Sequence, residues 1–93
     1  MDEIIELLNR FGIEDYEVEE LVNICPGLEI VDVDKAKSCI IAVIKSGYPL
    51  EDISSLIYAN PSFMMYEPNV LVSKLKSLGG DIERKLKDNP YII

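Results

Sequence analysis

The sequence contains no histidine and no tryptophan. Without histidine a Ser-His catalytic triad cannot be built. With only two cysteines, Cys25 and Cys39, a zinc site has too few ligands to close. The phosphate-binding motifs G-x-x-x-x-G-K-[ST] and G-x-G-x-x-G are also missing. These absences argue against an enzyme, and we predict no catalytic, cofactor-binding or metal-binding residues.

Long hydrophobic runs are missing as well. The longest are a few residues long, as in CIIAVI at 39–44, whereas a membrane span needs about 20 residues. The opening MDEIIELL is acidic where a secretory signal would be basic. Both cysteines lie in apolar periodic runs, as buried free thiols do in a reducing compartment. We therefore expect a cytoplasmic protein that does not contact a membrane.

The charges that are present are unevenly distributed. The 93 residues are 48% hydrophobic and 28% charged, which indicates one soluble globular domain over residues 1–93. The net charge is −8, but residues 1–34 hold eleven acids against one base, while residues 35–93 hold six acids against eight bases. The acidity is thus a property of the N-terminal third.

The sequence also repeats itself. Shifts of 35 and then 29 residues align glycine with glycine and proline with proline: Gly12 with Gly47, Pro26 with Pro61, and Asn60-Pro61 with Asn89-Pro90. Apolar residues three and four apart predict amphipathic helices between these positions. We expect an all-α fold, a right-handed or curved stack of about two and a half helix-turn-helix repeats resembling a small α-solenoid. It would have about six helices with short 3₁₀ connectors, in repeats at approximately 4–33, 34–68 and 69–93.

Local signals predict where the helices begin and end. Asp15, Asp34 and Asp81 are the expected N-caps, and the residue before each proline should leave helical geometry. The apolar residues after two of the prolines should form short turns that fill the core between units: Phe63, Met64 and Met65, then Ile92 and Ile93. Residues 28–33 are read as an irregular or 3₁₀ connector, because no second strand is available to pair with them.

Residues 47–93 contain GYPLEDISSLIYANPSFMM followed by LVSKLKSLGGDIERKLKDNPYII. This run resembles the repeat of the mitochondrial transcription termination factor (mTERF) family, in which a helix runs to a proline, an apolar tail follows, and a second helix ends in Leu-Gly. The matching positions are Ile53, Pro61, Leu71, Leu75, Leu78, Gly79, Ile82 and Pro90. The resemblance implies stacked helix-turn-helix units in a curved solenoid and nucleic-acid binding by a basic concave face.

The candidate nucleic-acid-binding residues are the C-terminal bases Lys74, Lys76, Arg84, Lys85 and Lys87. Together they could form a local positive patch. The structural alternative is that these bases stabilise helix C-termini, since acids are interspersed among them. The sequence favours this alternative but leaves both open.

Aromatic and acidic residues are candidates for a protein partner. Tyr48 and Tyr66 stand beside prolines at helix junctions, where partly exposed aromatic rings can anchor a partner. Core or rim packing is the favoured role for most of the tyrosines. Glu17 and Glu20 lie on the crowded acidic side of a helix, for which a solvated face is the default interpretation. Asp32 and Asp34 lack the spacing of a calcium loop, so capping of the helix that follows is preferred there.

Three functions remain. The leading hypothesis is a protein-protein interaction module with a protein partner, because stacked helices present an extended face. One alternative is mTERF-like nucleic-acid binding through the C-terminal bases. Another is charge mimicry, in which the acidic N-terminal part imitates a phosphate backbone and occupies a basic site on a partner. The tail Tyr91-Ile92-Ile93 packs into its own core or onto a second copy, so we expect a monomer or a weak homodimer through the C-terminal end.

Overall fold

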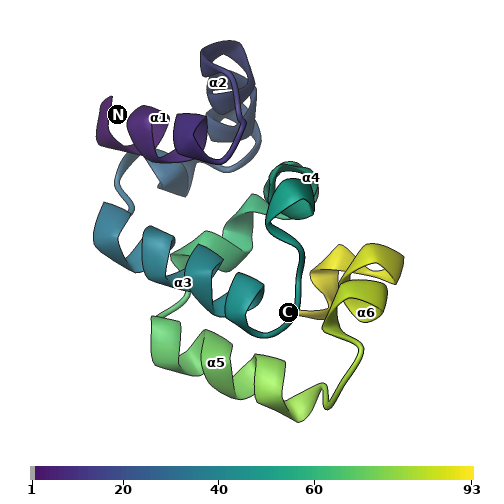
Figure 1. The fold of residues 1–93 in the computed structure, drawn as a ribbon. Helices are drawn as coiled ribbons and strands as arrows, with labels where there is room; N and C mark the ends of the chain where they lie inside the picture. Colours follow the sequence, from purple (N-terminus) through teal and green to yellow (C-terminus); the bar gives the residue numbers. More distant parts are fainter. Residues whose placement is uncertain (1) are drawn as a thin grey trace.

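The computed structural model describes residues 2–93, so Met1 of the predicted domain lies outside the described residues. These residues form α-helices and 3₁₀-helices (η) and no strand, which confirms the predicted all-α class (Figure 1). The elements are α1 (Asp2–Arg10), α2 (Asp15–Ile24), η1 (Pro26–Glu29), α3 (Val33–Lys45), η2 (Leu50–Asp52), α4 (Ile53–Ala59), η3 (Pro61–Met65), α5 (Pro68–Ser77), α6 (Ile82–Asp88) and η4 (Pro90–Ile92).

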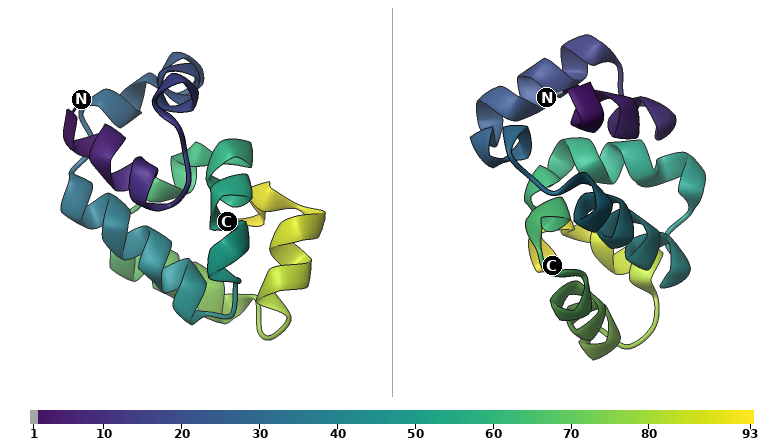
Figure 2. Two further views of the ribbon diagram at one scale, coloured as in Figure 1. Left: turned by 45° about the horizontal axis from the view of Figure 1, so that its top comes forward. Right: turned by 90° about the vertical axis from the view of Figure 1, so that its left-hand side faces the viewer.

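One order of elements occurs three times. Two α-helices are followed by a 3₁₀-helix that begins with proline, in α1-α2-η1, α3-α4-η3 and α5-α6-η4, called here the first, second and third units. The second unit differs from the others in having a further 3₁₀-helix, η2, between its two α-helices. The third unit, predicted as a partial one, contains all three kinds of element. Figure 1 shows α1, α3 and α5 along one side of the molecule and α2, α4 and α6 along the other. Since α3 contacts both α1 and α5, the second unit lies between the other two (Figure 2).

The backbone before each proline is closely similar in the three units. Cys25, Asn60 and Asn89 have φ of −131°, −144° and −148°, with ψ of 79°, 75° and 94°. These are not helical values, because a proline ring crowds the preceding residue out of the α region. The helices therefore end where the sequence predicts. Within the connector at 28–33, only the first two residues are 3₁₀, and Val33 already begins α3.

Two of the predicted N-caps are shifted along the chain. Glu14, not Asp15, precedes α2, and its N–H donates to the Glu17 carboxylate at 3.0 Å. Asp32, not Asp34, caps α3 by accepting from the N–H groups of Asp34 and Lys35 at 2.9 and 3.2 Å. The extended backbone of Asp32 aims its carboxylate at these N–H groups, whereas Asp34 is already helical.

Asp81 stands at the predicted N-cap position of α6 but does not cap it. Its φ of 57° is left-handed, and its side chain makes no capping hydrogen bond. The carboxylate instead pairs with Arg84 at 3.2 Å. The position was predicted correctly, but the capping role was wrong.

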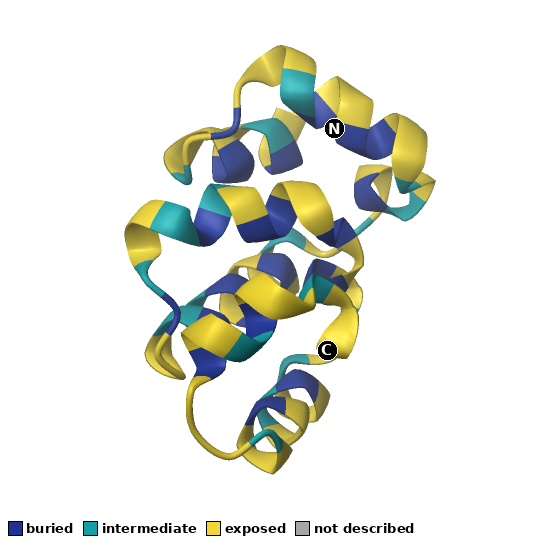
Figure 3. Ribbon diagram, turned by 90° about the vertical axis from the view of Figure 1, so that its right-hand side faces the viewer, coloured by how far each residue is buried: buried dark blue, intermediate teal, exposed yellow. Residues whose placement is uncertain are grey.

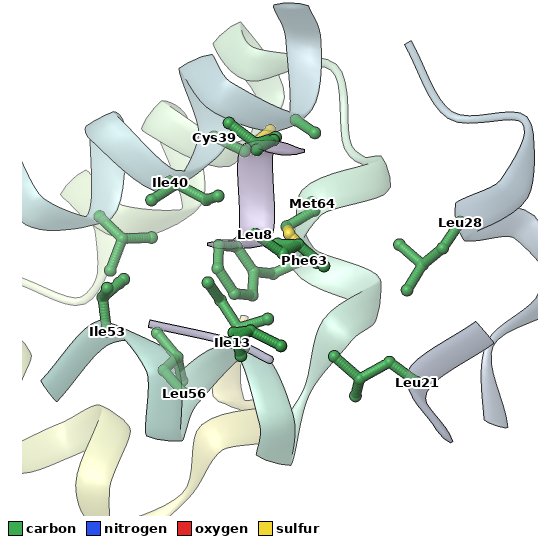
Figure 4. Packing of buried hydrophobic residues seen from close by; sticks show 14 of the residues in the cluster. Leu8, Ile13, Leu21, Leu28, Cys39, Ile40, Ile53, Leu56, Phe63 and Met64 are labelled. Carbon is green, nitrogen blue, oxygen red and sulfur yellow. The ribbon is translucent and has the colours of Figure 1, made fainter. Parts of the chain in front are cut away.

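One hydrophobic core runs through the three units. Figure 3 shows buried residues on the inner side of every α-helix, and Figure 4 shows Phe63 and Met64 among side chains of several elements. Phe63 and Met64 are fully buried, and Ile93 is only 6% exposed, as the prediction of core-filling turns requires. Met65 and Ile92 are 44% and 40% exposed, so for these two residues that prediction was wrong.

Candidate interaction surfaces

The acidic residues of the N-terminal third are almost all exposed and form no ion pair with a described residue. All eleven acids of residues 2–34 lie in α1, α2, η1, the start of α3 or the adjoining turns, and only Glu17 among them is half-buried. None has a lysine or arginine within 4.0 Å in the part of the chain that the structure describes. Their negative charges are thus gathered at one end of the molecule, around α1 and α2 (Figure 1).

Most acids of residues 35–93, in contrast, form ion pairs. Four of the six acids in residues 35–93 form ion pairs: Lys35–Glu67 at 2.7 Å, Arg84–Asp81 at 3.2 Å, and Lys87 with both Asp52 and Glu83 at 2.8 Å. The hydrogen bond and charge of Glu67 raise the pKa of Lys35. The charge asymmetry of the sequence is therefore sharpened in the structure, because pairing neutralises mainly the C-terminal acids.

The predicted basic patch is divided between two helices and is partly neutralised. On α6, Arg84 and Lys87 are held in ion pairs, and Lys85 donates to the Leu78 carbonyl. Hydrogen bonds from Lys87 to Asp52 and Glu83 raise the pKa of its ammonium. Each of these cations already has a local acceptor, which agrees with the structural alternative.

The other two bases of that set lie on α5. Lys74 lies over the Tyr66 ring, 5.4 Å from its centroid, and Lys76 is exposed. Neither forms an ion pair with any described residue. Lys74 and Lys76 are thus the members of the set left for an external anion.

The predicted partner-binding tyrosines are less exposed than their positions indicate. Tyr48 is only 4% exposed, so it has the core-packing role that the sequence favours for most tyrosines and not that of a partner-binding ring: the residue after the left-handed Gly47 turns into the core. Lys87 lies 6.0 Å from the centroid of its ring. Tyr66 is half-buried, and its hydroxyl donates to the Ile93 carbonyl at 3.2 Å, which ties the C-terminal tail to the second unit.

Tyr58, which the sequence analysis did not name as a candidate, contacts the acidic helix α2. The Tyr58 hydroxyl on α4 donates to the Glu20 carboxylate on α2, and this bond raises the pKa of Tyr58 to about 12. The two residues are 38 positions apart. A sequence signal did exist, because α2 and α4 occupy equivalent positions in the predicted repeat. The exposed faces of the two helices could have been compared on that basis.

Cys39 is a buried structural thiol. Both cysteines are free, and burial raises the pKa of the Cys39 thiol to about 11. A thiol that stays protonated is a poor nucleophile. Cys25 Sγ lies 3.5 Å from Met65 Sδ, a contact between the first and second units. Within residues 2–93, no group of three or more histidine, cysteine or acidic side chains is arranged to hold a metal ion.

Comparisons with protein-family models, with curated proteins and with solved structures gave no match. The mTERF resemblance therefore stays a prediction. Among the described helices, none has both the length and the apolar character needed to cross a membrane.

Proposed function

We propose that this protein is a non-enzymatic interaction module in the cytoplasm and that its acidic first unit binds a basic surface of a protein partner. The observation that carries the proposal is the gathering of exposed, unpaired carboxylates in that unit. Such a concentration of one charge is unfavourable for the isolated fold, because like charges repel. A basic partner would relieve the repulsion and would be drawn in by the same field.

The two alternative functions from the sequence analysis relate to this proposal in different ways. Charge mimicry is a special case of the same contact, in which the basic partner surface ordinarily holds nucleic acid. Direct nucleic-acid binding would depend on Lys74 and Lys76, since the bases of α6 are occupied by Asp81, Leu78, Asp52 and Glu83. Two free lysines would neutralise few phosphates and give weak binding.

Fluorescence anisotropy of a labelled lysine-rich peptide tests the proposal. We expect saturable binding at about 50 mM salt that weakens at about 200 mM, because salt screens contacts between exposed charges. The double variant Glu6→Lys and Glu19→Lys should abolish the binding. Both residues are exposed and belong to the first unit.

The matched control places the same charge change elsewhere. Glu51→Lys and Asp88→Lys also replace exposed acids that have no ion-pair partner among the described residues, but outside the first unit. Equal weakening by the two double variants would overturn the proposal, because net charge alone would then explain binding. Salt-sensitive binding of duplex DNA that Lys74→Glu and Lys76→Glu reduce would instead favour the nucleic-acid alternative.

A further inference from the structure

Two adjoining grooves flank α4. The groove between α2 and α4 has a volume of about 410 Å³ and borders Glu17 and Tyr58, whereas the groove between α4 and α6 has a volume of about 350 Å³ and borders Tyr48. Ser55 and Ala59 of α4 border both grooves. Figure 1 shows α4 between α2 and α6, so the two grooves form one surface across α4, called here the α4 groove.

The composition of α4 explains why this surface is hollow. Its bulky residues Ile53, Leu56 and Ile57 are buried in the core. Ser55 and Ala59 are exposed and four residues apart, which puts them on the same face of the helix. Because these two side chains are small, they project less from α4 than the side chains of the helices on either side do, and a groove remains above them.

The rim of the α4 groove is negatively charged even beside the C-terminal unit. Glu17 and Glu20 stand on the α2 side, where Glu20 accepts from Tyr58. On the α6 side Lys87 is bonded to two carboxylates, those of Asp52 and Glu83. Glu17, Glu20 and Asp52 beside the groove outnumber its one ammonium, that of Lys87, so a positively charged ligand is the complementary one.

The kind of ligand follows from what the groove offers. Residues 2–93 contain no strand, so there is no sheet edge to which an extended peptide could be added. A helix laid in a groove needs only side-chain contacts. The exposed Tyr58 and Ala59 and the half-buried Pro90 supply the apolar surface of the groove. The complementary ligand is thus a helix with one apolar face and basic residues beside it.

We propose that the α4 groove seats a basic amphipathic helix of the partner protein. Its lysine or arginine side chains would lie against Glu17 and Glu20, the carboxylates of the first unit beside the groove. This inference rests on the proposed function, because it names the place and the form of the basic partner segment.

The probe is a synthetic amphipathic peptide of leucine, alanine and lysine, about 18 residues long, because shorter isolated helices are marginal in water. Chemical-shift mapping on the ¹⁵N-labelled protein should place the largest changes at residues 54–59 and in α6. Ala59→Arg should weaken binding about tenfold or more, since it obstructs the centre of the groove. Ser73→Arg, at an exposed position on α5, makes the same change of charge and should weaken binding much less.

A charge-free variant separates obstruction from repulsion. Ala59→Gln fills the same position without adding charge, and we expect it to weaken binding as well. If Ala59→Arg and Ser73→Arg weaken binding equally and the chemical-shift changes are confined to α1 and the outer side of α2, the α4 groove is not the binding site. The proposed function would stand in that case. Failure of both this probe and the lysine-rich peptide to bind would overturn the groove and the proposed function together.

A second copy of this chain is the alternative ligand to be tested for the α4 groove. Sedimentation over a range of protein concentrations distinguishes it from a partner helix. Self-association that Ala59→Arg abolishes, without binding of the probe, would overturn the proposal, because the groove would then serve a homodimer. A protein that sediments as a monomer and binds the probe is the expected result.

Discussion

At the scale of single residues, the burial of some side chains differs from what the sequence predicts. Tyr48 was a candidate for a partly exposed partner-binding ring and is buried, while Met65 was expected in the core and is exposed. Both are apolar or aromatic residues beside a glycine or proline turn, and local rules do not tell which side of the turn faces the core. Cys39 was expected to be a buried free thiol and is one.

The buried thiol of Cys39 makes stability depend on alkaline pH. Its pKa is raised from 9.0 to about 11 by burial and by the charge of Glu67. Between these values the unfolded chain loses the thiol proton and the folded chain keeps it, so unfolding is favoured as pH rises. The stabilising term is fully present below pH 9 and is lost as pH approaches 11.

Urea unfolding of the wild type and of Cys39→Ala over this pH range checks the prediction. The other titrating groups are present in both proteins, so the difference between their unfolding free energies isolates Cys39. We expect this difference to shrink as pH rises from 9 to 11. A difference that does not vary with pH would show that the thiol titrates alike in both states.

Helices and their ends are the scale at which the sequence is most informative. The positions before Pro26, Pro61 and Pro90 end helices because proline geometry is local. N-caps were less predictable, because two acids stand close together before α2 and before α3. Either acid of each pair could accept the first N–H groups, and the packing of the helix decides which one does.

The two adjacent glycines after α5 allow a matched test of a helix end. Gly79 has a φ of 80°, whereas Gly80 is not in the positive region. An added Cβ has room at both positions, since the nearest atom to it is 3.8 Å away at Gly79 and none lies within 4 Å at Gly80. The two sites therefore differ in backbone strain and not in crowding.

Gly79→Ala should lower the free energy of unfolding by about 1–2 kcal/mol, the cost of a left-handed residue that carries a Cβ. Gly80→Ala should be neutral or stabilise by up to about 1 kcal/mol, because alanine restricts the unfolded chain. Chemical denaturation of the two variants checks this. Equal losses of stability would mean that strain at Gly79 is not the cause.

The whole molecule is joined by contacts between units that no local rule predicts. Asn60, only 1% exposed, donates from Nδ2 to the Pro90 carbonyl at 2.9 Å and accepts from Ser62 Oγ at 2.5 Å. It thereby links η3 of the second unit to η4 of the third. Its counterpart in the third unit, Asn89, is exposed, and its side-chain oxygen accepts from the N–H of Tyr91 at 3.1 Å.

Asn60→Ala should lower the free energy of unfolding by about 1–3 kcal/mol, because it removes a buried hydrogen-bond partner. Asn89→Ala, the matched variant at the exposed counterpart, should cost less than about 1 kcal/mol. Hydrogen exchange should show that the Asn60 variant loses protection first in α6 and η4. Unchanged protection there would indicate that apolar packing alone holds the third unit in place.

The sequence by itself determined the all-α class, the places where helices end and the acidic character of the N-terminal third. These properties follow from apolar spacing, from proline geometry and from charge counts, all of which act locally or add up over the chain. Only the tertiary structure decided that the first unit's acids form no ion pair with a described residue, while Asp52, Glu67, Asp81 and Glu83 pair with lysine or arginine. The α4 groove likewise depends on α2, α4 and α6 meeting. Pairing and grooves arise between residues far apart in the chain, and packing alone brings those residues together.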